Sequence, residues 1–79
     1  RNVLILRMRS VPAMDITALN GLRRLWHECR DKEIQVLFSH VNEQPMSVFK
    51  KSGMYDLAGA DSFVPNIDAA LDRAAGLHT

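Results

Sequence analysis

The chain has 79 residues, of which 47% are hydrophobic and 24% charged, and its formal net charge is +1 at pH 7. This length suits one small domain, and the composition is that of an ordinary globular protein, which excludes disordered and fibrous classes. Acidic and basic residues alternate along the whole chain, so no basic stripe favours nucleic acid or an anionic lipid surface as a partner.

The single cysteine, Cys29, can form no internal disulfide and cannot complete a paired-cysteine site for zinc or redox chemistry. A reducing compartment is therefore favoured. No apolar run approaches the roughly 18 residues of a membrane-spanning helix, and charges interrupt the short apolar stretch at the N-terminus. We expect no membrane-inserted segment in this chain, no cofactor and no metal site.

The first predicted element is a strand at residues 2–8, NVLILRM, because a compact run of branched apolar residues is typical of a strand covered on both faces. A break at residues 10–12 follows, and Asp15 has the residue type that caps a helix N-terminus. A helix is predicted from there to about Asp31. Its apolar residues recur at steps of three and four, which defines an inward stripe of Ile16, Leu19, Leu22, Leu25, Trp26 and Cys29.

A second strand is predicted at residues 34–39, IQVLFS, which completes a β-α-β unit. Parallel strands joined by a helix cross over in a right-handed sense, so the turn before Asp15 and the turn after Ser39 should lie at the same edge of the sheet. That edge is the expected place for a functional site.

The remaining elements are a short helix at residues 44–52, a short strand at residues 61–64 and a last helix. Pro45 suits the start of the short helix and Gly53 suits a left-handed stop after it. Asn66 is the expected cap of the last helix, which should end at Gly76. Its expected inward stripe is Ile67, Ala70, Leu71 and Ala74. The predicted fold class is α/β, with the order β-α-β-α-β-α and a small, mainly parallel sheet.

Three segments in the same order resemble the STAS domain family. Residues 3–20, VLILRMRSVPAMDITALN, are similar to the buried strand of that family and its VPxMD turn into the first helix. Residues 50–57, KKSGMYDL, resemble the SG turn after the second helix, and residues 63–71, FVPNIDAAL, resemble the closing strand and helix. The resemblance implies the STAS fold, which is also that of the anti-sigma factor antagonists.

Two departures from the family pattern matter. STAS domains usually begin with further strands, so residues 1–79 are expected to form a single STAS-like domain truncated at its N-terminus. In the free-standing bacterial relatives, the residue after the turn aspartate is a phosphorylatable serine, but here that residue is Ile16. Thr17 follows one position later and would point about 100° away on a helix, where it is interpreted as a polar residue of the first turn.

A candidate contact surface follows from the predicted edge of the sheet. It comprises Asp15, Ile16, Thr17, Ser39, His40 and Asn42, and it could contact a protein, or weakly bind an anion or nucleotide through the free N–H groups of the helix start. A structural cap by itself explains Asp15 fully, and no glycine-rich phosphate-binding motif is present. His40 has no orienting acid or second ligand in the sequence, so no catalytic residue is assigned.

The resemblance implies a non-catalytic regulatory or protein-interaction domain of a SulP-type, sulfate-like anion transporter. Its expected partners are the transmembrane domain of the same transporter, the dimer mate of that transporter, or another cytosolic regulatory protein. Its expected location is the cytoplasmic side of the cell membrane, in bacteria the inner membrane. The alternative is a free-standing anti-sigma factor antagonist of a partner-switching cascade, which would need a phosphate acceptor where Ile16 stands.

Overall fold

Three parallel strands form the centre of the chain in the computed structural model, which describes residues 2–77. The strand order is β1 (Asn2–Arg7), β2 (Ile34–Ser39), β3 (Phe63–Val64). β1 pairs with β2 along its whole length, whereas β3 adds only two pairs at the end of β2. β2 is therefore the central strand, and its last four residues are buried.

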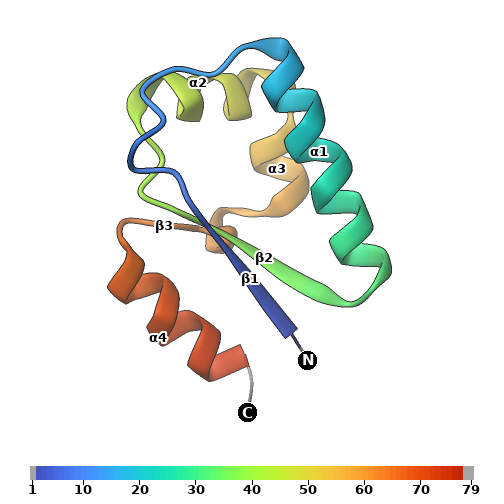
Figure 1. Cartoon of the computed structure of the whole chain (residues 1–79), viewed down its shortest axis with the longest axis vertical. Helices are drawn as coiled ribbons and strands as arrows, with labels where there is room; N and C mark the ends of the chain where they lie inside the picture. Colours follow the sequence, from blue (N-terminus) through green and yellow to red (C-terminus); the bar gives the residue numbers. More distant parts are fainter. Residues whose placement is uncertain (1, 78–79) are drawn as a thin grey trace.

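Helices cover both faces of this sheet (Figure 1). On one face lie α1 (Ile16–Asp31), α2 (Glu43–Ser52) and the short α3 (Met54–Ala58), and on the other lies α4 (Ile67–Leu77). A single 3-10 turn, η1 (Ala60–Ser62), leads from α3 into β3. The arrangement is a small α/β fold in which each β-strand is followed by a helix.

The main core lies between the sheet and the three helices α1 to α3. Phe38 of β2 is at its centre and is fully buried, with its ring centroid 5.2 Å from that of Phe49 and 4.9 Å from that of Phe63. Side chains of a strand alternate between faces, so Leu37 points to the opposite side, where the buried Ala70 of α4 lies. The single strand β2 thus contributes buried apolar side chains to both faces of the sheet.

The predicted order of strands and of the three predicted helices, the parallel sheet, and the caps Asp15, Asn66 and Gly53 are confirmed. Asp15 caps α1 through a hydrogen bond from the Ala18 N–H, 2.8 Å long, and Asn66 accepts the corresponding bond from the Ala69 N–H at 2.8 Å. Gly53 ends α2 with φ of 83°, in the left-handed region that glycine adopts without steric cost. Each of these three residues acts within a few positions of the helix end that it marks.

Several boundaries differ from the sequence prediction. The first strand ends at Arg7, the last helix continues through Gly76 to Leu77, and strand β3 is only Phe63–Val64 because η1 takes up the preceding residues. Helix α3 was not predicted, because five residues are too few to show a helical period. It begins directly after Gly53, which reverses the chain and lets buried Met54 enter the core.

Two residues were wrongly assigned to inward stripes. Ile16 is 65% exposed and Leu71 is 54% exposed. Ile16 is the first residue of α1, where the helix has not yet come over the sheet, and Leu71 follows Ala70, the residue of α4 that faces the strands. Apolar character alone therefore overestimated the width of both buried faces.

Replacement of Phe38 by alanine should lower the free energy of unfolding by about 3–5 kcal/mol, because it leaves a cavity where three aromatic rings meet. Urea unfolding followed by circular dichroism would measure this loss. The matched control is Leu71→Ala, which removes an exposed side chain and should change the free energy of unfolding by less than about 0.5 kcal/mol. Equal losses in the two variants would contradict the assignment of the core.

Candidate functional site

The turn after β1 and the turn after β2 lie side by side at the carboxyl edge of the sheet, as predicted. The Met8 N–H donates to the Ser39 carbonyl at 2.9 Å, which extends the β1–β2 ladder by one residue beyond β1. The side-chain amide of Asn42 then donates to the carbonyl groups of Arg9 and Val11 at 3.0 and 2.9 Å, and lies 3.5 Å from the Met8 carbonyl. Asn42 thus holds the β1–α1 loop against the start of α2.

Asn42 occupies the N-cap position of α2 but makes no side-chain capping bond to that helix. Its amide nitrogen is used on the loop instead, so the residue type that often caps a helix here connects two turns. This role requires a side-chain N–H group that donates to the loop carbonyl groups. A carboxylate has no such donor, and a hydroxyl group is carried on a shorter side chain. The predicted site residue Asn42 is therefore a structural link within the edge.

Gln44 holds the other end of the same loop. Its side-chain oxygen accepts a hydrogen bond from the Met14 N–H at 2.7 Å, and its side-chain nitrogen donates to the Met14 carbonyl at 3.3 Å. Met14 itself is buried in the core, directly before the cap residue Asp15. The sequence analysis did not predict this contact. The signal available was a glutamine in the first turn of a helix that begins at the predicted edge.

The start of α1 presents an exposed surface with little polar functionality. The Asp15 carboxylate is engaged with the Ala18 N–H, while Ile16 and Thr17 are both exposed. Pro12 and Ala13, in the preceding loop, are also exposed. The helix start therefore offers aliphatic side chains to the solvent, with its capping aspartate already paired.

The turn after β2 contributes less than predicted. Ser39 is only 1% exposed, so its side chain does not reach the surface, and the predicted site must be corrected by its removal. The reason is that Ser39 still belongs to β2 and pairs with Val64 of β3. His40 is exposed, with φ of 53°, and its N–H donates to the Val64 carbonyl at 3.0 Å.

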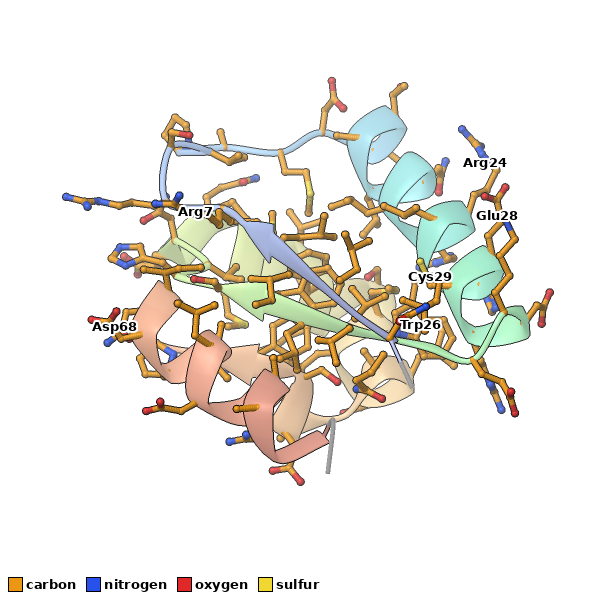
Figure 2. All side chains as sticks on the ribbon, turned by 60° about the horizontal axis from the view of Figure 1, so that its bottom comes forward. Arg7, Arg24, Trp26, Glu28, Cys29 and Asp68 are labelled. Atoms are coloured by element: carbon orange, nitrogen blue, oxygen red, sulfur yellow. The ribbon has the colours of Figure 1, made fainter. Side chains whose placement is uncertain are left out.

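The rest of α1 is an ordinary amphipathic helix. Figure 2 shows Trp26 and Cys29 on the side of α1 that faces the strands, while Arg24 and Glu28 point away from them. Cys29 is buried and belongs to the core, as predicted, and the guanidinium carbon of Arg30 lies 5.5 Å from the centre of the Trp26 ring. The exposed apolar character of α1 is thus concentrated at its start.

Asp15 and His40 are the titratable residues of the predicted site. Within residues 2–77, no group of three or more histidine, cysteine, aspartate or glutamate side chains is arranged to hold a metal ion. Asp15 and His40 come from different turns, and neither makes a side-chain hydrogen bond to the other. Over the same residues, no helix is long and apolar enough to cross a membrane.

Comparison with known proteins defines the family. The profile of the STAS domain matches residues 1–73, which is nearly the entire chain. The fold is also that of a sulfate transporter family protein from Wolinella succinogenes, whose crystal structure superposes with a TM-score of 0.92 at 30% sequence identity over 96% of this chain. The chain belongs to the STAS domain family.

A second relative comes from a plant. The chain is 30% identical over 70 residues, 89% of its length, to a protein of Arabidopsis thaliana named sulfate transporter 4.1, chloroplastic. It spans 10% of the length of that transporter and 62% of the Wolinella succinogenes chain. Both relatives are thus longer proteins whose names refer to sulfate transport.

Replacement of Asp15 by alanine should lower the free energy of unfolding by about 1 kcal/mol, because the Ala18 N–H loses its partner. Asp15→Asn is the matched control, since asparagine caps helices about as well as aspartate. Denaturant unfolding of the three proteins would measure the differences. An unchanged midpoint in Asp15→Ala would show that the carboxylate does not stabilise the start of α1.

Asn42→Asp should loosen the β1–α1 loop, because it replaces the donating amide by a carboxylate that faces three carbonyl groups. We expect a loss of about 1–3 kcal/mol in the free energy of unfolding. Faster hydrogen exchange at the Val11 amide, which bonds to the Met8 carbonyl, would locate the change. The same substitution at exposed Asn20, on α1, is the control and should leave the loop unaffected. Identical exchange in the two variants would contradict the role of Asn42.

Proposed function

We propose that this chain is a non-catalytic regulatory domain of a sulfate transporter-like membrane protein, and that it acts through protein contacts on the cytoplasmic side of the membrane. The observation that carries the proposal is the exposed apolar start of α1, where Ile16 follows the turn aspartate. The printed names of both relatives refer to sulfate transport, which supports the same class.

The contact surface is proposed to consist of Asp15, Ile16, Thr17, His40 and Asn42. Ile16 would supply most of its apolar area, since it is the most exposed of the large hydrophobic residues described. Asn42 and Gln44 would keep this surface in one shape before a partner binds, because they fix both ends of the β1–α1 loop. A surface that is already ordered loses less conformational entropy on binding.

The partners proposed are the transmembrane domain of the same transporter and its dimer mate, or a cytosolic regulatory protein. An aliphatic surface such as that of Ile16, Pro12 and Ala13 suits a protein partner better than a small charged solute. A weak anion or nucleotide contact at the start of α1 is disfavoured, because the Asp15 carboxylate already accepts the Ala18 N–H and adds negative charge.

The alternative of a free-standing antagonist in a partner-switching cascade predicts phosphate on the residue after the turn aspartate. Ile16 has no hydroxyl group, and Thr17 is the nearest acceptor. The two functions also predict native polypeptides of different size and cellular fraction. An antibody against this chain should detect a large protein in the membrane fraction of the source cells under the transporter proposal, and a small protein in the soluble fraction under the alternative.

Ile16→Glu in the complete transporter polypeptide should lower uptake of radiolabelled sulfate several-fold without lowering the amount of protein in the membrane. The reason is that a carboxylate would replace the aliphatic centre of the proposed contact surface. The control is Leu71→Glu, which introduces the same charge at another exposed leucine, on α4. Uptake that is unchanged by Ile16→Glu, or reduced equally by both variants, would contradict the proposed surface.

A further inference from the structure

The edge of β2 that faces β3 is paired over only part of its length. Among the residues that the structure describes, β3 pairs with Phe38 and Ser39, so the earlier residues of β2 have no strand partner on that side. In a parallel ladder, the backbone groups of alternate residues point to opposite sides. The Ser39 carbonyl bonds to Met8 on the β1 side, so the backbone groups of Leu37 also point to β1. Those of Val36 point to the unpaired side.

A cavity of about 370 Å³ opens at this unpaired stretch. It is lined by residues 34–36 of β2, by the last turns of α1 and by α3, so every part of its lining lies well inside the sequence. Trp26 faces the strands from α1 (Figure 2), and Leu57, on α3, is 43% exposed. Arg30 and Glu33 are the charged residues of the lining, and because their charges are opposite, the cavity favours an occupant without net charge.

Two side-chain hydrogen bonds connect the walls of this cavity. The Gln35 amide nitrogen donates to the Ser62 hydroxyl oxygen at 3.4 Å, and the Ser62 hydroxyl donates to the Ala58 carbonyl at 2.9 Å. Gln35 belongs to β2 and Ala58 is the last residue of α3, so the bonds hold the end of α3 at a fixed distance from the strand. A cavity that is held in one shape loses less conformational entropy when it is filled.

We infer that this cavity binds an extended peptide segment of a partner protein, which adds to β2 as a short antiparallel strand. The N–H and C=O groups of Val36 are a donor and an acceptor on the edge of a strand, and the backbone of a peptide offers the complementary pair. In an antiparallel ladder, a single peptide residue can exchange both hydrogen bonds with Val36. Parallel pairing would need the two residues that flank this position, and β3 already occupies the edge from Phe38 onward.

The peptide residue opposite Val36 should carry an uncharged aliphatic side chain. Residues that lie opposite each other in a sheet direct their side chains to the same face, and the Val36 side chain belongs to the main core. The peptide side chain would therefore lie on the side of Trp26 and Leu57. A small anion is a poorer occupant, because it would leave the Val36 carbonyl without a donor.

This site is separate from the contact surface proposed above. Ile16 begins α1 at the carboxyl edge of the sheet, whereas the cavity lies at the amino end of β2, beside the last turns of the same helix. The 16 residues of α1 span about 24 Å. A substitution at one site should leave the other intact, so the two proposals can fail independently.

Titration with the blocked, uncharged peptide acetyl-Ser-Thr-Val-Thr-Ser-amide tests the inference. Trp26 is the one tryptophan of the chain and lines the cavity, so we expect a saturable change in tryptophan fluorescence. The control peptide carries a methyl group on its valine nitrogen, which removes the N–H group that would donate to the Val36 carbonyl. It should bind roughly tenfold more weakly. Equal binding of the two peptides, or no saturable change with either, would overturn the inference.

Leu57→Glu locates the binding site. It should weaken binding of the unmethylated peptide several-fold, because it places a carboxylate in the apolar wall of the cavity. The matched control is Leu71→Glu, which introduces the same charge at another exposed leucine, on α4 and outside the cavity. Circular dichroism would verify that both variants are folded. Equal weakening in the two variants would show that the peptide binds elsewhere.

Amide hydrogen exchange gives a measurement that needs no variant. In the free chain, the Val36 N–H should exchange faster than the Leu37 N–H, which pairs with β1. The unmethylated peptide should slow exchange at Val36 and leave exchange at Leu37 nearly unchanged. If Val36 is already as protected as Leu37 in the free chain, this edge of β2 has a partner and the inference is overturned.

Discussion

The parallel pairing of β1 with β2 is the constraint on which the rest of this domain depends. It brings the turn after β1 beside the turn after β2, two segments about thirty residues apart in the chain. The Met8–Ser39 hydrogen bond prolongs the pairing into those turns. The register of this strand pair thus sets which two turns meet at the carboxyl edge.

The side-chain amides of Asn42 and Gln44 fix the conformation of the β1–α1 loop, the first of these two turns. A loop from Met8 to Met14 has its own backbone groups to satisfy, and water would satisfy them in many conformations. Because the two amides bond to the loop at both ends, one conformation is favoured and the exposed residues Pro12, Ala13 and Ile16 keep fixed positions. A surface that is held in one conformation loses less conformational entropy when a partner binds to it.

One central strand, β2, contributes to the buried apolar layers on both faces of the sheet. β2 contributes Phe38 to the layer under α1 to α3 and Leu37 to the layer under α4, so both faces depend on the same six residues. β1 is covered less completely, with its first and last residues exposed and the others half-buried. The two strands thus differ in exposure although their sequences are similarly apolar.

Much of the fold was predictable from the sequence, because its signals are local. The apolar runs at residues 2–8 and 34–39, the helical period after Asp15, and the capping residues Asp15, Asn66 and Gly53 each act within a few residues along the chain. The side-by-side placement of the two turns followed from the same signals and from the handedness of the β-α-β crossover. The family was recognised separately, from motifs in the sequence that resemble those of STAS domains. These features do not depend on the details of packing.

Only the tertiary structure decided which side chains of the predicted site are available. Ser39 is buried because β3 pairs with the end of β2, and Asn42 is directed to the loop because the chain from Arg9 to Val11 passes within reach of its amide. Ile16 and Leu71 are exposed because packing covers a narrower stripe of each helix than their apolar residues suggest. Such outcomes depend on contacts between residues distant in the chain, which neither composition nor periodicity encodes.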